Sequence, residues 1–179
     1  MLRYGLAAFA ACALALAPPG ARADDNKEYL VKAAFIYNFV KFVEWPGALA
    51  IVKHSNIDIC VVGDSPLSDT GSVFKAASTA KLTLSLVDEK NWRNASQHCH
   101  ILFISDSEAG KLGEILASLK NQPVLTVSDM DNFAEKGGMI GFVVSDNKIK
   151  LVVNTKSVAA AGMRVDAQLL EIALKVIDR

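Results

Sequence analysis

The stretch 28–46, EYLVKAAFIYNFVKFVEWP, constrains the fold more than any other part of the chain. Its spacing predicts a helix over 24–44, because Asp24 and Asp25 suit a helix N-terminus and the residue before Pro46 is pushed out of the helical region. At 100° per residue this helix is apolar on two stripes: Val31, Phe35, Phe39 and Phe42, and then Tyr29, Ile36, Val40 and Val43. Such a helix is expected either to lie between a sheet and another element or to turn one stripe toward a partner chain.

The first residues have the pattern of a secretory signal peptide. Arg3 gives the positive start, residues 6–17 form a short apolar run, and residues 21–23 read Ala-Arg-Ala. We predict cleavage after Ala23, which gives a signal peptide of 1–23 and one domain of 24–179. Lipidation at Cys12 is the alternative, although Phe9 suits that modification poorly.

Cleavage would remove Arg3 and Arg22 from a chain with 19 basic and 19 acidic residues, and would leave a net charge of −2. No clustered basic face suggests nucleic-acid binding. No later segment is long and apolar enough to span a membrane. The sequence therefore predicts a soluble, exported domain.

Two cysteines, Cys60 and Cys99, remain after cleavage. An even pair in an oxidising compartment favours a disulfide, whose loop of about 40 residues would contribute roughly 3–4 kcal/mol. Two buried free thiols are the alternative. A metal site at 98–100, His-Cys-His, is disfavoured because alternate residues of a strand point to opposite faces.

The rest of the chain alternates between strand and helix patterns. A helix is expected over 106–120, and Asp166 should cap a last helix with Leu169, Leu170, Ala173, Leu174 and Ile177 on its inner face. Residues 64–66, Asp-Ser-Pro, should cap a helical turn after the first strand. Strands are expected over 57–62, 81–87, 101–104 and 123–127, and a hairpin joins 139–144 to 148–153.

This order predicts a single three-layer α/β domain. Its sheet should be mixed but mostly parallel, with helices on both faces and a C-terminal hairpin plus helix.

No catalytic constellation emerges from the sequence, and we expect no enzyme activity, cofactor or metal. Gly63-Asp64-Ser65 could present a serine nucleophile, as in GDS-type lipases. A serine nucleophile needs a histidine base held by a carboxylate, and no histidine follows His100. A capping role for Ser65 is therefore the preferred interpretation.

Several motifs in one order resemble the YfiR family: KAAFIYNFVKFVEWP at 32–46, ICVVGD at 59–64, CHILFIS at 99–105 and PVLTVSD at 123–129. The resemblance continues through 133–140, 153–154 and 169–170, and so covers nearly all of the predicted mature chain. It implies a periplasmic regulator that represses an inner-membrane diguanylate cyclase by binding its periplasmic portion, and so lowers cyclic-di-GMP signalling and biofilm formation.

The resemblance further implies an outer-membrane lipoprotein that sequesters the regulator. Cys60 and Cys99 match the cysteines of the family's disulfide, while a second pair found in some members is missing. We expect Tyr37, Lys41 and Trp45 of the first helix to contribute to the cyclase contact or to a homodimer. The alternative function is a periplasmic small-molecule sensor, which a pocket with convergent polar groups would favour.

Overall fold

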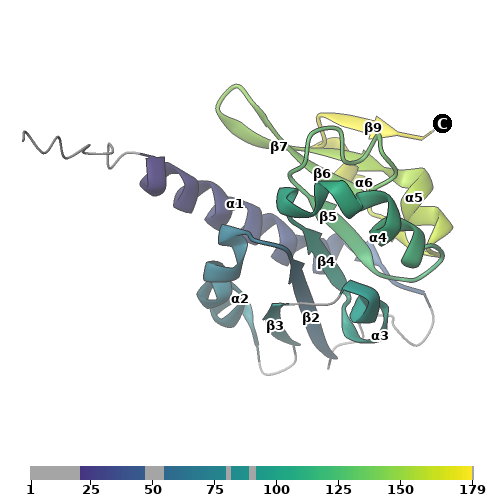
Figure 1. Cartoon of the computed structure of the whole chain (residues 1–179), viewed down its shortest axis with the longest axis horizontal. Coiled ribbons are helices and arrows are strands. Elements are labelled where there is room, and N and C mark those ends of the chain that lie inside the picture. Colours follow the sequence, from purple (N-terminus) through teal and green to yellow (C-terminus); the bar gives the residue numbers. More distant parts are fainter. Residues whose placement is uncertain (1–20, 47–54, 80–81, 89–91, 179) are drawn as a thin grey trace, which may run out of the picture.

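The computed structural model describes residues 21–46, 55–79, 82–88 and 92–178 (Figure 1). Most of the predicted signal peptide and the segment 47–54 lie outside these ranges. Among the described residues, no helix has both the length and the apolar character needed to cross a bilayer.

The predicted first helix is present as α1, Ala21–Phe42. Its last two predicted residues instead form strand β1, Val43–Glu44, which pairs antiparallel with β8, Arg164–Val165. The β-branched pair Val43 and Val165 lies opposite in this ladder, and Pro46 follows within two residues of β1. Cross-strand packing of β-branched side chains, together with the nearby proline, explains why the helix ends early.

A seven-stranded sheet in the order β3-β2-β4-β5-β6-β7-β9 forms the centre of the domain. Among the described strands of this sheet, β6–β7 is the one antiparallel pair, which confirms the predicted mixed, mostly parallel α/β class. The strands are β2 Ser55–Val62, β3 Leu82–Asp88, β4 Ile101–Ile104, β5 Leu125–Ser128, β6 Ile140–Ser145, β7 Lys148–Asn154 and β9 Lys175–Ile177.

The predicted hairpin joins β6 to β7 through Asp146 and Asn147. Both turn residues have positive φ, 52° and 55°. Two such residues are typical of the two-residue turn whose twist matches the flanking strands. In Figure 1 this hairpin and the N-terminal end of α1 extend toward the same side of the molecule.

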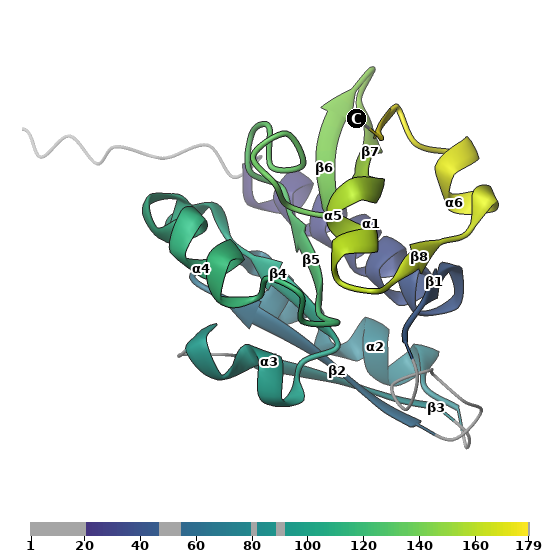
Figure 2. The same cartoon turned by 90° about the vertical axis from the view of Figure 1, so that its right-hand side faces the viewer.

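Alternating residues of β2 separate two hydrophobic cores. Ile57, Ile59 and Val61 face a cluster that includes α1 and α2, whereas Cys60 and Val62 face a cluster that includes α3 and α4. Figure 2 shows these helices on opposite sides of the sheet, as a three-layer domain requires. The shorter helices are η2 Pro66–Thr70, α2 Gly71–Ala77, η3 Trp92–Asn94, α3 Ala95–His98, η4 Asp106–Lys111, α4 Leu112–Ser118, α5 Thr155–Ala160 and α6 Ala167–Glu171.

Two predicted helices differ from the structure. The 106–120 helix begins as the 3₁₀ turn η4, and its α-helical part is only α4. The last helix is capped by Asp166 as predicted, but it ends at Glu171, and 175–177 form strand β9 against β7. Leu174 is 56% exposed, so its predicted place on an inner helix face was wrong. The otherwise open edge of β7 offers backbone pairing to β9, which a helix would leave unused.

Candidate functional site

Helix α1 presents an unusually apolar stripe to solvent. Leu30 and Val31 are 41% and 46% exposed, and Ala34 is also exposed one turn further along. Residues three and four apart lie on one helix face, so this stripe continues to Tyr37 and Lys41. We call residues 30, 31, 34, 37 and 41 the α1 stripe.

The three residues expected to contact a partner occupy different environments. Tyr37 is half-buried, and the exposed Lys41 places its ammonium 4.2 Å from the centre of the Tyr37 ring. This cation–π contact orders both side chains on the surface. Trp45 is only 5% exposed and packs in the core beneath the helix. The structure therefore brings Tyr37 and Lys41 together on the surface and leaves Trp45 as a buried support.

The opposite side of α1 carries a partly buried polar cluster, Glu28, Tyr29 and Lys32, which meets Asp129 from the loop after β5. The Lys32 side chain is 3% exposed, and its Nζ lies 2.5 Å from Asp129 Oδ2 and 2.6 Å from Glu28 Oε1. The Tyr29 hydroxyl donates to Asp129 Oδ2 at 2.8 Å. Burial, strengthened by the neighbouring Asp129 carboxylate, raises the pKa of Tyr29 well above its usual value, so the phenol stays protonated and donates.

A pocket of about 510 Å³ opens beside this cluster. Besides the four clustered residues it is lined by Asp131, by Pro66 after β2, and by apolar side chains of β6 and β7. Its volume falls within the range of about 300–1,000 Å³ that is typical of small-molecule sites. This pocket was not predicted from the sequence, because Asp129 and Asp131 belong to no motif that indicates a binding site.

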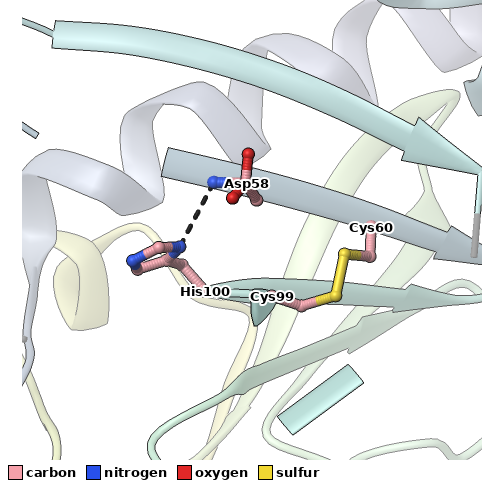
Figure 3. Close-up of a disulfide and its surroundings, with 4 residues drawn as sticks. All are labelled: Asp58, Cys60, Cys99 and His100. Carbon is pink, nitrogen blue, oxygen red and sulfur yellow. Dashed lines mark hydrogen bonds between the residues drawn. A yellow bond between two sulfur atoms is a disulfide. The ribbon is translucent and has the colours of Figure 1, made fainter. Parts of the chain in front are cut away.

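The two cysteines are joined on the other side of the sheet. Cys60 on β2 and Cys99 before β4 form a disulfide with their Cα atoms 5.8 Å apart (Figure 3). His98 has a ring nitrogen within 4.8 Å of both sulfurs, but sulfurs bonded to each other are not thiolate ligands for a metal ion. Cys60 and Cys99 therefore link β2 covalently to the segment that precedes β4.

His100 points away from the disulfide (Figure 3). The Asp58 backbone N–H donates to His100 Nδ1 at 3.2 Å, which requires an unprotonated nitrogen at that position. Burial lowers the pKa of His100, and the nearby Asp58 carboxylate opposes this shift. The side chains of His98 and His100 therefore do not converge on one site.

Ser65 has the capping role predicted for it. Its Oγ accepts from the Leu67 backbone N–H at 3.2 Å and so begins helix η2. Nearby, the Asp64 N–H donates to Ser107 Oγ at 2.9 Å, and Ser105 Oγ donates to the Asp64 carbonyl. These hydrogen bonds join the loops that follow β2 and β4 and give each serine a structural role.

A model of the YfiR/HmsC-like family matches residues 29–174. The matched range contains the disulfide, the polar cluster except Glu28, the whole α1 stripe and every strand of the central sheet except β9.

Two solved structures share the fold. The ABC domain from Streptococcus pneumonia in complex with L-Trp has a TM-score of 0.56 at 13% identity, and covers 84% of this chain and 60% of its own. A conserved domain protein from Vibrio cholerae O1 biovar El Tor has a TM-score of 0.57 at 10% identity, with coverages of 83% and 60%. This chain thus matches about 60% of the length of each. At such identities the likeness concerns the fold alone.

Proposed function

The chain belongs to the YfiR/HmsC-like family, and we propose that it is a periplasmic regulator that represses an inner-membrane diguanylate cyclase. It binds the periplasmic portion of the cyclase, and so lowers cyclic-di-GMP signalling and biofilm formation. The family match over residues 29–174 is the observation that carries this proposal. Repression of this kind is a binding activity and needs no catalytic group.

We propose that the regulator binds the periplasmic portion of the cyclase through the α1 stripe. Leu30 and Val31 supply exposed apolar area, and Tyr37 with Lys41 supplies an ordered aromatic and a cation. Aromatic side chains are enriched at the energetic centres of interfaces, and exposed apolar patches commonly mark them. Trp45 contributes indirectly, because its buried side chain packs in the core and holds the C-terminal end of α1 in place.

A repressor must bind the inactive state of the cyclase more tightly than the active state. Shifting a two-state equilibrium from mostly active to mostly inactive requires a difference of several kcal/mol in binding free energy. We propose that the exposed apolar residues of the α1 stripe and the Tyr37–Lys41 pair make the contacts that differ between the two states.

Binding of the purified protein to the purified periplasmic portion of the cyclase tests the proposal. Lys41→Glu reverses a charge within the stripe, and Lys156→Glu makes the same change on the exposed side of α5. We expect Lys41→Glu to weaken binding about tenfold or more, and Lys156→Glu to leave the affinity unchanged. If both variants bind the cyclase with the wild-type affinity, the α1 stripe is not part of the interface.

The same variants decide whether the stripe also joins two copies of the chain. We propose a homodimer, and light scattering after gel filtration would give its mass. If Lys41→Glu converts a dimer into a folded monomer and leaves the cyclase affinity unchanged, the stripe is a dimer interface instead.

A periplasmic small-molecule sensor is the second candidate function. The pocket beside Lys32 and Asp129 favours it, because several charged groups converge there on one cavity. The Streptococcus pneumonia domain of the same fold was solved with L-Trp, which supports the capacity of this architecture to hold a small molecule.

A further inference from the structure

The pocket beside Lys32 lies at the edge of the sheet where α/β domains bind ligands. In the sheet, β3 lies on one side of β2 and β4 lies on the other, although both strands follow β2 in the chain. The direction in which successive strands are added therefore reverses at β2. In open α/β sheets, ligands bind outside the carboxyl ends of strands near such a reversal. Pro66 follows β2, Asp129 follows β5, and Val143 lies near the carboxyl end of β6. The pocket therefore opens beyond the carboxyl ends of three parallel strands.

The charges around the pocket favour a cation. Glu28, Asp129 and Asp131 contribute three carboxylates, and Lys32 contributes one ammonium. That ammonium is buried and already contacts Glu28 and Asp129, so it neutralises one carboxylate and is not presented to an incoming anion. The lining keeps a net charge of −2, which attracts a positively charged group and repels a carboxylate.

Carboxylate oxygens of Asp129 and Asp131 remain available to a positively charged group. Both side-chain hydrogen bonds that Asp129 makes with other described residues use Oδ2, and Oδ1 takes part in none of them. Asp131 is exposed and has no ion pair within the described part of the chain. An ammonium group has three donors, so it can bond to oxygens of both residues at once.

The opposite wall of the pocket is apolar. Phe142 and Val144 of β6 and Ile149 of β7 line it, and strand alternation puts these three side chains on the same face of the hairpin. Combined with the carboxylates, this wall suits a molecule with a cationic head and a short hydrocarbon body.

We propose that this pocket binds a small organic cation, an alkylammonium compound whose ammonium lies between Asp129 and Asp131 and whose hydrocarbon part lies against Phe142, Val144 and Ile149. This site does not depend on the cyclase, because it is formed by one chain alone.

Titration of the purified protein with 3-methylbutylamine tests the proposal, with 3-methylbutanol and 4-methylpentanoate as neutral and anionic analogues. We expect saturable calorimetric binding of the amine, weaker binding of the alcohol and no binding of the carboxylate. Added salt should weaken amine binding, because the interaction is electrostatic. In amide NMR spectra, the amine should shift residues around Asp129 and Val143. Absence of saturable amine binding, equal binding of the carboxylate, or shifts centred elsewhere would overturn the proposal.

Two variants locate the site. Asp131→Asn removes one exposed carboxylate, and should weaken amine binding about threefold to fivefold, as expected for one partly exposed charge pair. Glu171→Gln makes a matched change on the exposed surface of α6 and should have no effect.

Val144→Phe should fill part of the cavity and reduce affinity at least about tenfold, while an unchanged urea midpoint shows that the variant still folds. Unchanged binding by both Asp131→Asn and Val144→Phe would exclude this pocket as the site.

Discussion

The two faces of the sheet are covered in different ways. One face packs against α1, a single helix of 22 residues, together with the shorter helices α2, α5 and α6. The other face packs against α3 and α4, of 4 and 7 residues, and carries the Cys60–Cys99 disulfide. A long helix buries a continuous apolar surface with one element, whereas short helices order few residues each and depend on additional links. The comparison indicates that this domain uses non-covalent packing on one face and a covalent tie on the other.

The largest expected effect comes from removing packing on the α1 face. Phe39 is fully buried and stacks on Phe142, with ring centres 6.1 Å apart. Phe39→Ala should lower the free energy of unfolding by about 4 kcal/mol, through lost burial and the cavity left behind. Urea unfolding measures this change. Val31→Ala on the exposed side of the same helix is the control and should cost less than about 1 kcal/mol, because Val31 is 46% exposed. Similar losses in both variants would show that α1 is not the main packing element of this face.

On the second face, the disulfide should have the next largest effect. Its cysteines are 39 residues apart, and a loop of that length corresponds to roughly 3–4 kcal/mol of stability in the chain-entropy model. The double variant Cys60→Ala/Cys99→Ala should lose about that much in urea unfolding. Hydrogen exchange should accelerate in α3 more than in α1. Equal acceleration in both helices would contradict the division of roles between the two faces.

A smaller effect tests whether the faces are energetically independent. Ile115 of α4 belongs to the disulfide-side core and Ile36 of α1 to the opposite core, and both are fully buried. Each Ile→Val change should cost about 1 kcal/mol. In the cysteine-free background, Ile36→Val should add its cost independently, whereas Ile115→Val should deviate by 0.5 kcal/mol or more, an order-of-magnitude estimate for residues that share a cluster. If the stability losses caused by Ile115→Val and by removal of the disulfide are strictly additive, the disulfide is not energetically coupled to the core around Ile115.

The smallest effect concerns pH. His100 has a pKa lowered by burial, and its unprotonated Nδ1 accepts a hydrogen bond from Asp58. The unfolded chain therefore takes up a proton at this residue more readily than the folded chain as pH falls below about 6.5. Stability contributed by His100 is present above that pH and decreases below it. The melting temperature of the wild type should fall between pH 7.5 and 5.5 more than that of His100→Gln, and parallel curves would rule out this contribution.

Strong local patterns predicted much of the fold. The strand-forming run at 57–62, rich in Ile and Val, and the continuous apolar run at 101–104 predicted strands β2 and β4, because a strand buried on both faces needs apolar side chains on both. The hairpin was predicted from Ser145-Asp146-Asn147, and the cap of α6 from Asp166. The structure has all of these elements near the predicted positions.

Elements that depend on a distant neighbour were not predicted. Strand β9 exists because β7 has a free edge, and the apolar spacing of Leu170, Ala173 and Leu174 also fits a helix. Helix α5 and strand β8 were not predicted either, since both are too short for a periodic pattern to appear.

The candidate site illustrates the same limit. Lys32 lies between apolar residues of the long first helix, and a lysine at such a position was a signal that could have been followed. Its partner Asp129 is 97 residues away in the sequence. No spacing rule connects two residues so far apart. Only the packing of α1 across the end of β5 brings them together.

The sequence by itself determined the long first helix, the strand-rich centre and a pair of cysteines suited to a disulfide. These follow from side-chain periodicity and residue chemistry, which act over a few neighbouring residues. The tertiary structure alone decided that Trp45 is buried while Tyr37 and Lys41 reach the surface, that Lys32 pairs with Asp129, and that 175–177 form a strand. Those outcomes depend on which surfaces meet after the chain has folded, because burial and pairing belong to two segments at once.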